Sequence, residues 1–171
     1  HRVICLDNLE TGSLTNIEHL RGDAFAFLPL DLTEHVEISE QIDFEKLRRS
    51  DKVKLFVCAS NVITNRLRVF EHSDISIDAV LASSCLPSLF QAVEINGDHY
   101  WDGGYMGNPP IFPIIYNCKS ADVLLIMINP IQTKQVPQTA QAILDRINTL
   151  SFNSGLMREM RAINFVNRLV D

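Results

Sequence analysis

A two-residue turn between strand-like runs constrains the fold more than any other stretch of this sequence. Asn96-Gly97 lies between two such runs, and this dipeptide is the strongest short-range signal for a β-hairpin. Asp102 would lie at the end of the second strand of the hairpin, directly before the pair Gly103-Gly104. Because glycine lacks a Cβ, another chain segment can approach the backbone closely there. Asp-Gly is also common in ordinary turns, so the dipeptide alone fits both a plain turn and a carboxylate held beside a reactive group.

Strand and helix patterns alternate along the rest of the chain, which predicts an α/β fold. Buried strands are expected at residues 3–8, 25–30, 53–59 and 123–128, an edge strand at 66–70, and helices at 37–50 and 76–82, after Pro137 and after Ser154. The first two strands end near Asp7 and Asp31, as is typical of the carboxyl edge of a parallel sheet. We therefore expect residues 1–42 to add two strands to the sheet that contains 53–59 and 123–128.

Composition narrows the class of protein. The 171 residues carry a net charge of -6, and 46% of them are hydrophobic, which predicts one globular domain. An acidic chain without a basic stripe argues against a nucleic-acid partner. The four cysteines form no C-x-x-C pair, so we expect reduced thiols and no metal site. Without a signal peptide or a membrane-length apolar run, we expect a cytoplasmic protein.

The last predicted helix carries an apolar face that has two interpretations. Its members are Leu156, Met160, Ile163, Val166 and Val170. Such a face either covers the sheet or lies on a lipid surface, and packing on the core is the commoner use. Peripheral contact with a membrane is thus the alternative that the sequence leaves open.

Short motifs in the first 40 residues carry one family resemblance. They are Val3-Ile4-Cys5-Leu6-Asp7-Asn8-Leu9, Thr11-Gly12, Asn16-Ile17 and Asp31-Leu32-Thr33. This part resembles extended short-chain dehydrogenases, which include nucleotide-sugar epimerases. The resemblance implies a Rossmann-like strand–helix–strand segment over residues 1–42, with NAD held by Asp7 at the ribose and by Asp31 and Leu32 at the adenine. The glycine-rich phosphate loop and the Tyr-x-x-x-Lys pair are absent from the sequence, which favours Asp7 and Asp31 as plain strand ends.

A second and longer resemblance covers residues 43–171. Its motifs are Phe56-Val57-Cys58-Ala59-Ser60-Asn61-Val62, Val80-Leu81-Ala82-Ser83-Ser84-Cys85-Leu86-Pro87, Tyr100-Trp101-Asp102-Gly103-Gly104-Tyr105-Met106-Gly107-Asn108-Pro109, Ile128-Asn129-Pro130, Ile143-Leu144-Asp145-Arg146-Ile147-Asn148 and Ser151-Phe152-Asn153-Ser154. This segment resembles bacterial patatin-like phospholipases. The resemblance implies a three-layer α/β/α acyl hydrolase with a mainly parallel central sheet, a serine–aspartate dyad, a lipid or acyl-ester substrate and no cofactor. Asp102 takes the role of the base, with Gly103 and Gly104 beside it.

The nucleophile of that dyad has no match in this sequence. No G-x-S-x-G elbow and no triple-glycine oxyanion loop occur in the 171 residues. Ser83 and Ser84 are weak substitutes, because the family has small packing residues there. We therefore expect a hydrolase segment that keeps its base, lacks its nucleophile and is inactive alone. An NAD-dependent nucleotide-sugar enzyme and a non-catalytic or chimeric α/β module are the alternatives.

Overall fold

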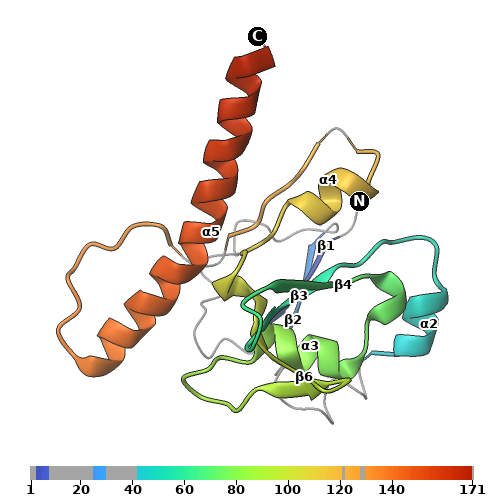
Figure 1. The fold of residues 1–171 in the computed structure, drawn as a ribbon, viewed down its shortest axis with the longest axis horizontal. Helices are drawn as coiled ribbons and strands as arrows, with labels where there is room; N and C mark the ends of the chain where they lie inside the picture. The colour runs from blue at the N-terminus through green and yellow to red at the C-terminus, as the bar shows by residue number, and fades with distance from the viewer. Residues whose placement is uncertain (1–2, 8–24, 30–41, 121, 128–129, 171) are drawn as a thin grey trace.

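A computed structural model describes residues 3–7, 25–29, 42–120, 122–127 and 130–170 (Figure 1). Its elements, in chain order, are β1 (Val3–Asp7), β2 (Phe25–Pro29), α2 (Phe44–Arg49), β3 (Val57–Asn61), β4 (Leu67–Phe70), η3 (His72–Asp74), α3 (Ile77–Ser84), β5 (Val93–Ile95), β6 (Asp98–Asp102), η4 (Gly103–Tyr105), α4 (Phe112–Asn117) and α5 (Ala140–Val170). The expected α/β class is confirmed.

A four-stranded antiparallel sheet, in the order β4-β3-β6-β5, forms the centre of the described structure. The predicted hairpin joins β5 to β6 through Asn96 and Gly97, whose φ angles are 54° and 84°. Positive φ at both central residues is what a type I′ turn requires, and this explains the sequence preference. The predicted edge strand is also confirmed, because β4 lies at one side of the sheet.

The expected sharing of one sheet by the first two strands is wrong. β1 and β2 do pair in parallel, with Val3 opposite Phe25, but they form a separate two-stranded sheet. Residues 122–127 form no strand, and Leu124 is 77% exposed. The central sheet is antiparallel because short turns connect β3 to β4 and β5 to β6, whereas parallel neighbours need long crossovers. The described strands thus do not form the mainly parallel sheet that we expected.

The core lies between the sheet and α3. Buried side chains from β3, β4, β6, α3 and the link between η3 and α3 pack together, and these are Ala59, Phe70, Ile75, Ala79, Ala82 and Tyr100. Phe70 and Tyr100 meet edge to face across the sheet, with ring centroids 5.7 Å apart. The hydroxyl of Ser76 accepts a hydrogen bond from the Ala79 amide, so the predicted cap of α3 is confirmed.

Residues 140–170 form one continuous helix, α5, where the sequence pattern predicts two. Ser154 caps no new helix, because its hydroxyl donates to the carbonyl of Ser151 at 2.9 Å. Gly155 lets α5 pass close to the turn after β6: a Cβ there would lie 3.3 Å from the Cα of Gly107. Glycine is unfavourable inside a helix, but this close contact gives Gly155 a packing role, and the helix continues through it.

The distal half of α5 projects away from the rest of the chain (Figure 1). Leu156 is buried, whereas Met160, Ile163, Val166 and Val170 are exposed, with Val170 at 79%. Packing of this apolar face on the sheet, the interpretation favoured from sequence, is therefore wrong beyond Leu156. The helix contacts the segment that follows β6, and nothing in the described chain covers its later turns.

Across the described ranges, no helix is both long enough and apolar enough to cross a membrane.

Candidate active site around Asp102

Asp102 is the last residue of β6, an inner strand of the four-stranded sheet. It pairs with Ala59 of β3, and its amide donates to the carbonyl of Cys85 at 2.8 Å. Its own carbonyl accepts from the hydroxyl of Ser60 at 2.8 Å. Three contacts therefore fix the backbone at Asp102. They are its pairing with β3, its bond to Cys85 after α3, and the bond it accepts from Ser60 of β3.

The carboxylate of Asp102 caps the short helix η4. Its Oδ1 accepts a hydrogen bond from the Gly104 amide at 2.7 Å. Burial raises the pKa of this carboxyl from 3.8 to about 6, and the Gly104 hydrogen bond opposes part of that rise. A carboxylate with a pKa near neutral is suited to accept and return a proton at physiological pH.

Gly103 and Gly104, the predicted companions of Asp102, are both buried and tightly enclosed. A Cβ at Gly103 would overlap the carbonyl oxygen of Cys58 and lie 2.5 Å from its carbonyl carbon. A Cβ at Gly104 would lie 2.9 Å from Cδ1 of Phe152 and 3.1 Å from Oδ1 of Asp102. The glycine pair thus lets β3 come close to Gly103 and α5 come close to Gly104.

Residues of α5 also contact the segment that follows Asp102, and the sequence analysis did not predict these contacts. The hydroxyl of Tyr105 donates to Asn148 at 2.7 Å, and its ring meets that of Phe152 edge to face at 5.1 Å. Farther along the helix, Glu159 accepts a hydrogen bond from the Ile111 amide at 2.8 Å. The available signal was a spacing of four and seven residues between Asn148, Phe152 and Glu159, which places them on one helix face.

The serines near the site are held in other ways. Ser83 donates to the carbonyl of Val80 at 2.7 Å, and Ser84 donates to main-chain carbonyls of the same helix. Ser60 lies beside Asp102 but bonds its main-chain carbonyl. Within the described part of the chain, therefore, no serine hydroxyl hydrogen-bonds to the Asp102 carboxylate.

Cys58, Cys85 and Cys118 are free thiols. Burial, together with the charge of Glu159, raises the pKa of Cys58 to about 11. Burial also raises the pKa of Cys85, and the neighbouring Asp102 charge adds to that rise. Neither thiol is therefore activated as a nucleophile at neutral pH.

The structure describes only one of the three residues implied in nucleotide binding. Asp7 ends β1, and Asp31 and Leu32 lie outside the described residues. Their role in binding NAD stays a prediction. In the part of the chain that is described, no group of three or more His, Cys, Asp or Glu side chains is placed to hold a metal ion.

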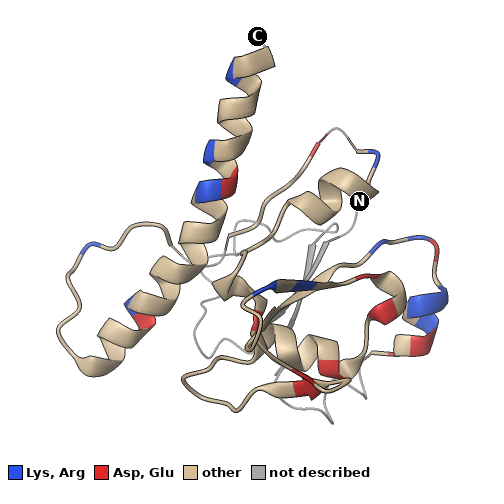
Figure 2. Cartoon of the chain, viewed as in Figure 1, with Lys and Arg blue, Asp and Glu red and all other residues tan. Residues whose placement is uncertain are grey.

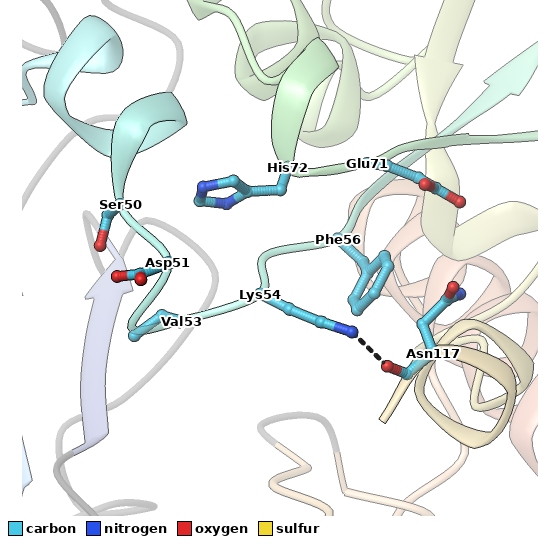
Figure 3. Close-up of a pocket in the computed structure, with 8 residues that line it drawn as sticks. All are labelled: Ser50, Asp51, Val53, Lys54, Phe56, Glu71, His72 and Asn117. Atoms are coloured by element: carbon cyan, nitrogen blue, oxygen red, sulfur yellow. Dashed lines mark hydrogen bonds between the residues drawn. The ribbon is translucent and has the colours of Figure 1, made fainter. Parts of the chain in front are cut away.

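Two cavities lie away from Asp102. One, of about 320 Å³, lies beside the start of β3 (Figure 3). Among the residues that line it, Lys54 donates to the Asn117 carbonyl at 2.6 Å, and the ring nitrogens of His72 are buried without a hydrogen-bond partner. The other, of about 450 Å³, lies between residues 130–139 and the first turns of α5. Asp102 lines neither cavity, so the cleft expected around its carboxylate stays a prediction.

Comparison with known proteins connects the geometry to a family. The sequence pattern described as patatin-like phospholipase matches residues 18–115. The matched range includes β2 through η4 and the first part of α4, and it contains the whole Asp102 turn. It begins within the first 42 residues, and the domain boundary expected at residue 42 stays a prediction. A comparison with curated proteins finds no match.

Proposed function

Because the chain belongs to the patatin-like phospholipase family, a family of lipid acyl hydrolases, we propose that it contributes Asp102 as the general base of a serine acyl hydrolase. The observation that carries this proposal is the environment of the carboxylate. It extends from the end of an inner strand, it is partly buried, and its pKa is raised to about 6. An ordinary surface aspartate in a turn has none of these properties, so the plain-turn interpretation is the weaker one.

The proposed chemistry explains why this carboxylate is needed. A serine hydroxyl attacks the ester carbonyl carbon, and Asp102 accepts the hydroxyl proton as the new C–O bond forms. Asp102 then returns that proton to the leaving alcohol, and a water molecule repeats the sequence to release the acid. The serine is not encoded here in a G-x-S-x-G elbow, so we propose that this chain alone is inactive.

Substrate and surroundings follow from the same proposal. We propose a lipid or acyl-ester substrate, a reaction that needs no cofactor, and a cytoplasmic protein with peripheral membrane contact. The exposed apolar side chains of distal α5 support such contact, as do the positive charges along that half of the helix (Figure 2). These charges belong to Arg158, Arg161 and Arg168. The three layers and mainly parallel sheet of the family also belong to the proposal, and they require strands beyond the antiparallel sheet described above.

The chain alone is expected to show no ester turnover through a serine–aspartate dyad. Loss of a nucleophile typically removes several orders of magnitude of rate, and without an oxyanion loop the remaining rate should be small as well. The measurements are hydrolysis of a short-chain nitrophenyl ester and covalent labelling by a fluorophosphonate, each with the native chain and with Asp102→Ala.

One pattern of results would show that the assignment of the nucleophile is wrong. It is stoichiometric fluorophosphonate labelling of Ser83 or Ser84 together with ester turnover that disappears in Asp102→Ala. Labelling that does not depend on Asp102 would instead identify an unrelated reactive serine, and mass spectrometry of the labelled peptide separates the two cases.

A further inference from the structure

One face of α5 lies against the turn that carries Asp102. Asn148, Phe152, Gly155 and Glu159 are spaced by four, three and four residues, so they share a single helix face. All four have a close neighbour in the segment that follows β6. The contact is thus a continuous one along three turns of helix rather than a single touching pair.

Phe152 lies against Gly104, whose amide donates to the Asp102 carboxylate. A Cβ on Gly104 would lie 2.9 Å and 3.0 Å from Cδ1 and Cε1 of its ring, and 3.1 Å from Oδ1 of Asp102. The ring edge and Oδ1 of Asp102 therefore both lie close to Gly104. An apolar ring beside Gly104 limits the access of water to that part of the turn.

Three further contacts hold the turn against α5. Tyr105 donates its hydroxyl to Asn148 at 2.7 Å while its ring packs edge to face on Phe152. Gly155 allows the helix to come within van der Waals distance of Gly107. The turn is consequently held by a hydrogen bond, a ring contact and a close backbone contact, all from the same helix.

We propose that Phe152 and Asn148 of α5 are positioning residues for Asp102, which close the Gly103–Tyr105 turn and keep water away from its carboxylate. The inference deepens the proposed function, because it concerns the same carboxylate, but its test does not depend on turnover. The distinguishing property is the proton affinity of Asp102 itself, which responds to the cover supplied by α5 and not to the presence of a nucleophile.

Other titratable groups face this region from the neighbouring elements. They are Cys58 on β3, Cys85 after α3, Tyr105 in η4 and Glu159 on α5. Burial raises the pKa of both Cys85 and Tyr105, and the negative charge of Asp102 adds to each rise. The two thiols and the Tyr105 hydroxyl are therefore neutral while Asp102 titrates, and they add no charge.

The test is an NMR titration of the Asp102 carboxyl carbon in the full chain, assigned by its loss in Asp102→Asn. We expect a midpoint near 6 in the native chain and a fall toward 3.8 in Phe152→Ala. Phe152→Leu keeps an apolar side chain at the same place and should retain most of the raised midpoint. Phe165→Ala is the matched control, because Phe165 lies on the same helix and is 62% exposed.

If Phe152→Ala does not fold, Asn148→Ala decides the question, and a smaller fall of the midpoint in the same direction is expected. An unchanged midpoint in folded Phe152→Ala, or in Asn148→Ala, overturns the proposal even if the melting temperature falls. A native midpoint near 3.8 also overturns it. If the native midpoint is near 6 but the α5 variants do not change it, the proposed role of Asp102 as base still stands.

Discussion

Gly103→Ala is expected to destabilise the fold by about 3 kcal/mol or more, or to prevent folding. The added methyl group would meet the backbone of β3, where it overlaps the Cys58 carbonyl oxygen and lies 3.1 Å from the Ala59 amide nitrogen. No side-chain rotation relieves a clash with main-chain atoms. The two segments would have to separate, and this would disturb the pairing of Ala59 with Asp102.

Gly97→Ala is the matched control for that variant. Gly97 has a positive φ of 84°, but an added Cβ meets nothing within 4 Å. The cost should be the backbone strain alone, about 1–2 kcal/mol. Urea denaturation of both variants measures the difference. Equal losses of unfolding free energy in the two variants would show that the approach of β3 to Gly103 is not as close as described.

Asp102→Asn is expected to stabilise the fold at neutral pH by up to about 3 kcal/mol. The pKa of Asp102 is about 6 when folded and its ordinary value is 3.8. The folded state thus holds the proton more tightly than the unfolded chain, so stability falls as pH rises from about 4 to about 6. Asparagine stays uncharged and still offers an oxygen to the Gly104 amide, so the variant avoids this loss.

Unfolding free energies at about pH 3.5 and pH 7.5 test the sign of this effect. The native chain and Asp102→Asn should agree at the lower pH and diverge at the higher one. Asp122→Asn changes an exposed carboxylate in a loop, and its difference from the native chain should stay small at both pH values. A variant that is less stable than the native chain at pH 7.5 would mean that the ionised Asp102 is stabilised by its surroundings.

Local signals predicted the parts of the structure that depend on neighbours in sequence. Asn96-Gly97 predicted the hairpin because both residues tolerate positive φ, and Ser76 predicted the start of α3 because its hydroxyl caps the first turn. The pair Gly103-Gly104 predicted a close approach of other segments to Asp102, and the structure identifies those segments as β3 and α5.

Distant contacts decided the features that the sequence pattern did not predict. Residues 123–128 have the composition of a buried strand, but residues 122–127 are paired with no other strand in the described chain, and Leu124 is exposed. Ser154 looks like the cap of a new helix, yet it lies inside α5, where Gly155 allows the close contact with Gly107. Hydrophobic periodicity reports that a face is apolar, but it does not report what that face meets.

We proposed Asp102 as the base of an acyl hydrolase, and this chain carries no serine in a G-x-S-x-G elbow. The most direct measurement is ester turnover after the chain is mixed with a second polypeptide from a patatin-like phospholipase, which carries a strand, a G-x-S-x-G elbow and the helix that follows. We predict turnover that appears on mixing, disappears with Asp102→Asn and persists with Asp98→Asn, a change at an exposed position on the same strand. Turnover by the mixture that survives Asp102→Asn would show that Asp102 is not the base.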